Sequence, residues 1–228
     1  GPSMSFIAVA SIIVDYVLTA SISTVSAVEN GMTFFNIGAT GKFIFEIGIV
    51  WFVAGLNILG IKENAKFTFG IFVIAAIVLI NLLTQGILHT TPHGWQTAGA
   101  SFVSVFQNFE GKNIFSMYFL VIVSVSSCIL AYSGIESVVQ TAGLVKSWKD
   151  VKKAYIFLAL KTGIFTPVLA LIVLSSNIKF GEHETDLITQ FAKMVGGVPF
   201  GYIVGITASI LLMMAVNTAY VASSELVE

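Results

Sequence analysis

The stretch FTFGIFVIAAIVLINLLTQGIL, residues Phe67–Leu88, carries no charged side chain from end to end. A helix of about 20 apolar residues, at a rise of about 1.5 Å per residue, spans a hydrocarbon core about 30 Å thick. The rest of the chain has the same character, since 56% of its 228 residues are hydrophobic and only 10% are charged. Soluble domains carry about 25% charged residues. The composition therefore excludes an ordinary soluble enzyme and predicts an all-α, polytopic helical protein embedded in a lipid bilayer.

Six apolar runs of this kind follow one another, separated by clusters of polar residues. The first run is too long for a signal peptide and no basic region precedes it, so we interpret it as a membrane span. Gly1-Pro2-Ser3 resembles the remnant of an expression tag, and the helical region is taken to begin at residue 5. The six predicted transmembrane helices are Ser5–Val28, Phe43–Leu59, Phe67–Leu88, Ile114–Val139, Ala154–Ser176 and Val198–Val221.

Two short connections, residues 61–66 and 144–153, hold most of the lysines, and the chain has no arginine. Six consecutive spans place these two connections on the same side of the membrane. By the positive-inside rule that side is the cytoplasm, which predicts a multi-pass protein of the plasma membrane with both chain ends cytoplasmic. On the outer side, Glu184–Met194 has apolar residues at helical spacing, and we expect a short amphipathic helix there.

Other functional classes are disfavoured by what the sequence lacks. The net charge is −1 and no basic stripe is present, so a nucleic-acid partner is not expected. Cys128 is the single cysteine, which excludes an intramolecular disulfide. The sequence shows no nucleophile–base set, no glycine-rich phosphate loop and no cluster of metal ligands. We therefore expect neither enzymatic activity nor a cofactor.

The first span carries a stripe of polar residues along one helical face: Ser11, Asp15, Thr19, Ser23 and Ser26. Such a stripe does not face lipid, so it packs on other helices through hydrogen bonds or lines a water-filled path. Serine and threonine are common in helix packing. A carboxylate is different, because it costs about 2.5–3.5 kcal/mol at the centre of a transmembrane helix, and it indicates a functional site.

A second candidate site lies in the fourth span, at Ser133, Gly134 and Glu136. Glycine weakens a helix, and a break near the membrane midplane frees backbone groups that bind an ion or the charged ends of a substrate. The alternative is that the helix ends near Gly134, which would place Glu136 at the membrane interface.

The remaining polar residues in the spans have simpler explanations. Lys161 and Glu46 lie close enough to a helix end for their charged groups to reach the interface. Asn57, Asn81 and Asn217 are interpreted as packing or hydrogen-bonding residues.

Four motifs together resemble the amino acid–polyamine–organocation (APC) superfamily of secondary transporters. One looks like the start of family helix three, one like the end of helix four and its cytoplasmic turn, one like the unwound centre of helix six, and one like the Ala-Asn-Thr segment of helix eight. In that order they are Val14-Asp15-Tyr16-Val17-Leu18-Thr19, Leu56-Asn57-Ile58-Leu59-Gly60-Ile61-Lys62-Glu63-Asn64-Ala65-Lys66, Tyr132-Ser133-Gly134-Ile135-Glu136 and Ala215-Val216-Asn217-Thr218-Ala219.

This resemblance implies a fold of five helices plus five in an inverted repeat, with two discontinuous helices meeting at a midplane site. The six spans would be family helices three to eight. Helices one and two and those from nine onward have no counterpart in the sequence, so we expect the chain to be a fragment or part of a longer protein.

Within the superfamily, the motifs look closest to proton-coupled potassium importers and their permease relatives. The resemblance implies a potassium ion held by Asp15, Thr19, Ser133 and Glu136, with serine in place of the importers' threonine at 133. The wider substrate or ion site would comprise Asp15, Tyr16, Thr19, Ser133, Gly134 and Glu136. The alternative role for one of the two carboxylates is to carry the coupled proton instead of binding the ion, since burial raises the pKa of an acid.

Two alternatives remain open. In an amino-acid permease, freed backbone groups around Gly134 would bind the substrate's carboxylate and ammonium ends. In a non-transporting membrane module, the six helices would serve assembly instead. Helix faces left without neighbours would also favour a homo-oligomer.

Overall fold

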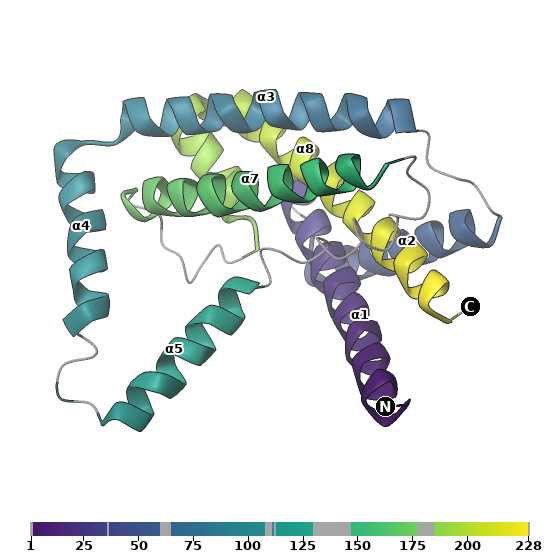
Figure 1. Ribbon diagram of the computed structural model, residues 1–228. Coiled ribbons are helices and arrows are strands. Elements are labelled where there is room, and N and C mark those ends of the chain that lie inside the picture. Colours follow the sequence, from purple (N-terminus) through teal and green to yellow (C-terminus); the bar gives the residue numbers. More distant parts are fainter. Residues whose placement is uncertain are drawn as a thin grey trace. The chain divides into compact units, whose positions relative to one another are not determined.

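The computed structural model describes residues 2–35, 37–59, 65–107, 111, 113–129, 147–176, 178 and 185–227. All regular secondary structure in these ranges is helical, which confirms the predicted all-α class there (Figure 1). The helices are α1 (Pro2–Met32), α2 (Ala39–Ile58), α3 (Ala65–His89), α4 (Pro92–Gln107), α5 (Ile114–Ile129), α7 (Trp148–Leu174) and α8 (Leu187–Val227).

Five of these helices, α1, α2, α3, α7 and α8, are long and apolar enough to cross a membrane. The described part of the fourth predicted span, residues 114–129, is helical and forms α5, with an apolar stretch at Ile114–Ser126. The rest of that predicted span lies outside the described residues. The described part of the chain therefore supports a multi-pass membrane protein with five candidate spans, and the sixth stays a prediction.

Helix α1 extends beyond the predicted end of the first span at Val28. It continues to Met32 and keeps Glu29 and Asn30 within the helix. The physical reason is that Asn30 is buried, with a relative exposure of 4%, and its side chain is hydrogen-bonded within the fold. A hydropathy scale scores asparagine as a residue of the membrane–water interface, because the scale takes no account of hydrogen-bond partners within the fold.

Helix α8 is broken at Gly197, which has φ 79° and ψ 177°. Positive φ is readily adopted only by glycine, and Pro199 follows where a new helix begins. The segment before the break, Leu187–Gly196, is called here the leading segment of α8. It overlaps the amphipathic helix expected near 184–194, but no loop separates it from the following span.

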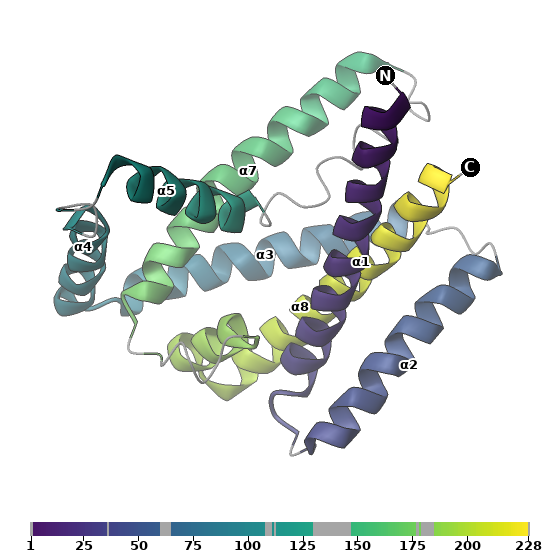
Figure 2. The same ribbon diagram turned by 90° about the horizontal axis from the view of Figure 1, so that it is seen from below.

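The chain divides into two compact units, residues 1–85 with 179–228 and residues 86–178. In the first unit, α1 packs along α8, and both contact α2 (Figures 1 and 2). Helices α1 and α8 run antiparallel, since Gly31 lies against Ser209 whereas Tyr16 packs with Ala219. In the second unit, α4 contacts α7, and the Thr90 and Ser175 hydroxyls lie 3.2 Å apart.

Small residues let α1 and α8 approach closely. A Cβ atom on Gly205 would lie 2.7 Å from the carbonyl oxygen of Asn30, and one on Gly31 would lie 2.9 Å from Oγ of Ser209. Gly201 and Gly205 are spaced as in the Gly-xxx-Gly pattern of tightly packed membrane helices. Gly205 is needed for the observed separation of the two helices, because its added Cβ would meet a backbone atom of α1.

Candidate functional site

The polar stripe predicted on α1 is buried unevenly. Ser11 is exposed, Asp15 and Thr19 are half-buried, and Ser23 is buried with a relative exposure of 7%. The Ser11 hydroxyl donates to the backbone carbonyl of Ile7, one turn earlier, over 2.8 Å. The stripe thus enters the helix packing at its C-terminal half, while its N-terminal half keeps an accessible carboxylate and hydroxyl.

Tyr16 fixes how α1 is turned about its own axis. Its side chain is 4% exposed and packs in a core cluster with Ala219 and Ala222 of α8, with Ile12 and Ala20 of α1 beside it. Two alanines on α8 leave space for the tyrosine ring between the helices. The sequence motif marked Tyr16 as a site residue, and the structure gives it a place in the α1–α8 contact.

Because Tyr16 faces α8, its position determines the direction in which the other predicted site residues of α1, Asp15 and Thr19, project from the helix. At about 100° per residue, Asp15 and Thr19 both project to the same flank of α1, roughly 100° and 60° away from Tyr16. Asp15 and Thr19 therefore share one half-buried face of α1. A carboxylate and a hydroxyl one turn apart offer oxygen ligands to a cation or an ammonium group.

The other predicted site residues, Ser133, Gly134 and Glu136, lie outside the described residues. Their proximity to Asp15 stays a prediction, as does the break in the helix at Gly134. Within the described residues, no group of three or more histidine, cysteine, aspartate or glutamate side chains is arranged to hold a metal ion.

An amide pair ties α2 to α8. Nδ2 of Asn57 donates to Oδ1 of Asn217 over 2.8 Å and also to the backbone carbonyl of Val53 over 2.9 Å. The hydrogen-bonding role predicted for these two asparagines is confirmed. Because Asn217 stands two residues before Ala219, neighbouring positions of α8 contact α2 on one side and Tyr16 of α1 on the other.

A second polar cluster, which the sequence did not predict, surrounds Asn30 at the other end of α1. Nδ2 of Asn30 donates to the carbonyl oxygens of Ser26 and Thr185, both over 2.8 Å, and its Oδ1 accepts from the hydroxyl of Thr189 over 2.7 Å. Thr189 is 0% exposed. Both ends of the Asn30 amide are therefore satisfied in a buried position, as burial of a polar group requires.

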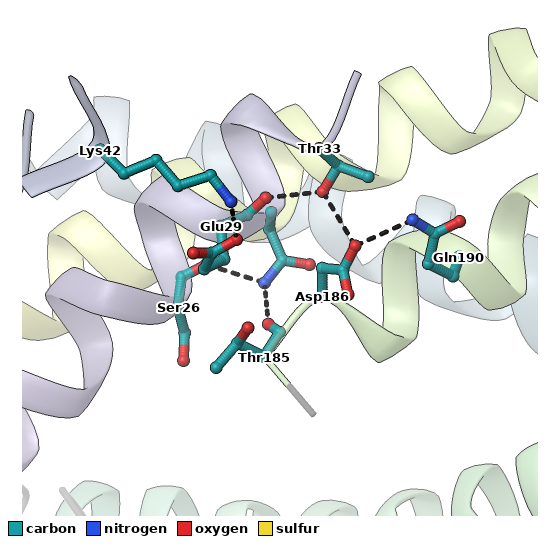
Figure 3. Close-up of polar contacts among 8 residues, drawn as sticks. Ser26, Glu29, Thr33, Lys42, Thr185, Asp186 and Gln190 are labelled. Carbon is teal, nitrogen blue, oxygen red and sulfur yellow. Dashed lines mark hydrogen bonds and ion pairs between the residues drawn. The ribbon is translucent and has the colours of Figure 1, made fainter. Parts of the chain in front are cut away.

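The same cluster continues through charged side chains (Figure 3). Oδ2 of Asp186 accepts from Nε2 of Gln190 over 2.9 Å and from Oγ1 of Thr33 over 3.4 Å. Nζ of Lys42, in the first turn of α2, pairs with Oε2 of Glu29 over 2.5 Å. These contacts join the C-terminal end of α1 to the beginnings of α2 and α8.

Sequence reasoning missed this cluster because its members are scattered over three segments. The predicted spans leave residues 29–42 as one connection, and the apolar spacing of Leu187, Ile188, Phe191 and Met194 predicts an amphipathic helix without indicating its polar contacts. The buried face includes Thr189 and Phe191, while Met194 is 48% exposed. An asparagine directly before a glycine, at Asn30-Gly31, was the available signal for a close and polar helix contact.

Comparison with known proteins bears on the transporter prediction. A family model described as amino acid permease matches residues 1–228, which is the entire sequence. No curated protein and no solved structure matches the chain. The match agrees with the APC resemblance at the level of a membrane transporter, and it carries no indication of potassium as the substrate. The chain belongs to the amino acid permease family, and it is accordingly a transport protein rather than an enzyme.

Proposed function

We propose that this protein carries amino acids across a membrane as a secondary transporter. The observation that carries the proposal is the match of an amino acid permease model to the whole of residues 1–228. The half-buried Asp15 and Thr19 support it, since a carboxylate and a hydroxyl suit the ammonium end of an amino acid.

In this proposal the two ends of the substrate are held by different parts of the chain. Asp15 and Thr19 contact the ammonium end from α1. Backbone groups freed around Gly134 contact the carboxylate end, with Ser133 and Glu136 beside them. Tyr16 serves by packing on α8, because this contact keeps Asp15 and Thr19 turned to one flank of α1.

Potassium uptake is the second candidate, and the pairing of Asp15 with Thr19 on one face is the observation that favours it. A dehydrated potassium ion needs several oxygen ligands and a compensating negative charge in a low-dielectric site. The same residues would act with Ser133 and Glu136, and a proton would be the coupling ion.

Uptake into proteoliposomes separates the two candidates. The purified full-length protein is reconstituted, and entry of a panel of radiolabelled L-amino acids is compared with entry of ⁸⁶Rb⁺, a potassium tracer. We expect saturable uptake of at least one amino acid and no ⁸⁶Rb⁺ uptake above that of empty liposomes. Uptake of ⁸⁶Rb⁺ alone would favour the potassium candidate, and uptake of neither would overturn the proposed function.

The role of Asp15 is tested with a matched pair of variants. Asp15→Asn removes the charge while nearly keeping the shape, and we expect at least a tenfold loss of uptake. Asp150→Asn makes the same change at an exposed position in the first turn of α7, where uptake should stay at the wild-type level. Equal uptake by both variants would remove Asp15 from the site.

A further inference from the structure

Helix α4 begins directly after α3 and is held against the end of α7. Only Thr90 and Thr91 separate α3 from α4. The Thr90 and Ser175 hydroxyls lie 3.2 Å apart, and a Cβ atom on Gly94 would lie 2.5 Å from the backbone oxygen of Ser175, the residue that caps α7. Because α3 and α7 are both candidate membrane spans, α4 starts at the level where spans end, which is the membrane–water interface.

Helix α4 does not itself have the form of a membrane span. Its 16 residues, at about 1.5 Å each, reach about 24 Å, which is less than the hydrocarbon thickness of about 30 Å. The helix has a defined start, since the amide of Gly94 donates to Oγ1 of Thr91 over 3.2 Å and Pro92 occupies the first helical position. Figures 1 and 2 show α4 running across α7 rather than along it. A helix that crosses the end of a span in this way lies along the membrane surface.

Polar and apolar residues are separated on α4 more clearly than on the other described helices. Trp95, Gly99 and Val103 form what is called here the apolar side of α4. By helical spacing, positions 102 and 106, which both carry phenylalanine, fall in the same sector of about 100°. The polar side consists of His93, Gln96, Thr97, Ser101, Ser104 and Gln107.

The contact with α7 uses a different face of α4 and leaves the apolar side uncovered. Gly94 contacts Ser175, and Ala98, one turn later on the same face, is 5% exposed. Trp95 is 45% exposed and Val103 is 55% exposed, so the described part of the chain does not bury them. The position of Trp95 is about a quarter turn from that of Gly94. Because α4 crosses α7, this direction runs along the axis of α7, which as a span follows the membrane normal.

The polar side of α4 satisfies its own hydroxyl groups. The Thr97 hydroxyl donates to the carbonyl of His93 over 3.0 Å, the Ser101 hydroxyl to the carbonyl of Thr97 over 2.9 Å, and the Ser104 hydroxyl to the carbonyl of Ser101 over 2.8 Å. All three hydroxyls are exposed. This side therefore needs no protein partner and suits contact with water and lipid headgroups.

We propose that α4 is an interfacial helix that binds the membrane surface, with its apolar side turned into the boundary between lipid headgroups and acyl chains. Tryptophan is enriched at this boundary, and amphipathic helices bury their apolar face there to a depth of about 5–10 Å. Helix α4 contains no aspartate, glutamate, lysine or arginine. Its binding therefore rests on apolar burial, and a zwitterionic phospholipid surface is sufficient. The inference does not depend on which substrate the protein transports.

Spin-label accessibility tests the proposal on the full-length protein in phosphatidylcholine nanodiscs. Single cysteines replace Gly99 and Val103 on the apolar side and, as matched controls, Thr97 and Ser104 on the polar side, in a background free of native cysteines that includes Cys128→Ser. Position 99 accepts a side chain, because no atom in the described part of the chain lies within 4 Å of its added Cβ. Oxygen concentrates in lipid, whereas the nickel complex Ni(II)EDDA stays in water.

We expect the ratio of oxygen accessibility to Ni(II)EDDA accessibility to be at least threefold higher for Gly99→Cys and Val103→Cys than for Thr97→Cys and Ser104→Cys. Adding anionic phosphatidylglycerol should leave this difference unchanged. Ready access of Ni(II)EDDA to all four positions would place α4 in water above the membrane and overturn the proposal. Poor access of both reagents to positions 99 and 103 would mean that protein covers the apolar side, and it would overturn the proposal as well. A difference seen only with phosphatidylglycerol would refute binding without lipid charge.

The fluorescence of Trp95 gives a second measurement that needs no cysteine variant. Lipids brominated near the headgroup quench tryptophans that reach the boundary between headgroups and acyl chains. We expect Trp95→Phe to remove part of the quenching that the wild type shows, whereas Trp148→Phe provides a comparison at an exposed tryptophan of α7. Quenched fluorescence that is the same in the wild type and in Trp95→Phe would overturn the proposal.

Discussion

The hydroxyl of Thr189 donates a 2.7 Å hydrogen bond to Oδ1 of Asn30, although 159 positions of sequence separate the two residues. The bond lies where α1 and the leading segment of α8 meet, and both side chains are buried. Because a buried polar atom without a partner costs about 1–3 kcal/mol, this contact predicts how the chain responds to changes at either residue.

Thr189→Val should lower the free energy of unfolding by about 1–3 kcal/mol, since it leaves Oδ1 of Asn30 without its donor while keeping the packing volume. Thermal unfolding in a mild detergent measures the change. Thr207→Val is the control, because the Thr207 hydroxyl donates to the carbonyl of Ile203 within its own helix. Equal stability losses in both variants would mean that the contact with Asn30 adds nothing.

Gly205→Ala should destabilise the protein by about 1–3 kcal/mol, the usual cost of adding a methyl group to a tightly packed contact. The new Cβ would lie 2.7 Å from the backbone oxygen of Asn30, which cannot turn aside as a side chain can. Gly70→Ala provides the comparison, because no atom in the described part of the chain lies within 4 Å of its added Cβ. There the higher helix propensity of alanine should leave stability unchanged or raise it. A stable Gly205→Ala protein would contradict the close approach of α1 and α8.

The Asn57–Asn217 pair should show a coupling energy of about 0.6 kcal/mol, with an upper value near 1.7 kcal/mol, as measured for hydrogen bonds between membrane helices. A double-mutant cycle with Asn57→Ala and Asn217→Ala isolates this term. Each single variant also removes contacts of its own, so only the cycle reports the bond between them. If the stability losses of the two single variants simply add in the double variant, the 2.8 Å hydrogen bond between Asn57 and Asn217 is not formed in the membrane.

Tyr16→Ala should cost about 3 kcal/mol or more, because it empties the space that the ring fills against Ala219 and Ala222. Tyr16→Phe keeps the ring and should retain most of that stability. Unfolding in detergent compares the two variants. If both lose the same amount, the packing of the ring is not what holds α1 against this part of α8.

The ion pair between Glu29 and Lys42 should contribute less than about 1 kcal/mol, since both side chains are in partial contact with solvent. Raising the salt concentration from about 0.01 M to 1 M shortens the Debye length from about 30 Å to 3 Å and should weaken the pair. High salt should therefore lower the melting temperature of the wild type slightly. Glu29→Gln lacks the ion pair at every salt concentration, so its melting temperature should fall less when salt is added. The same salt response in both proteins would show that the pair is not formed.

The sequence alone determined that this is a helical membrane protein, because hydrocarbon requires about 20 apolar residues per span and the chain repeats such runs. It also placed Asp15, Tyr16 and Thr19 on one helix, since helical spacing is a local property. The tertiary structure decided what no local pattern encodes: the rotation of α1 set by Tyr16, the continuation of α1 past Glu29, and the break in α8 at Gly197. In the first two cases the deciding contacts join residues far apart in the chain, whereas α8 turns at the positive φ of Gly197. The buried amide of Asn30 is the clearest example, since it is tolerated only because Thr185 and Thr189 supply its partners.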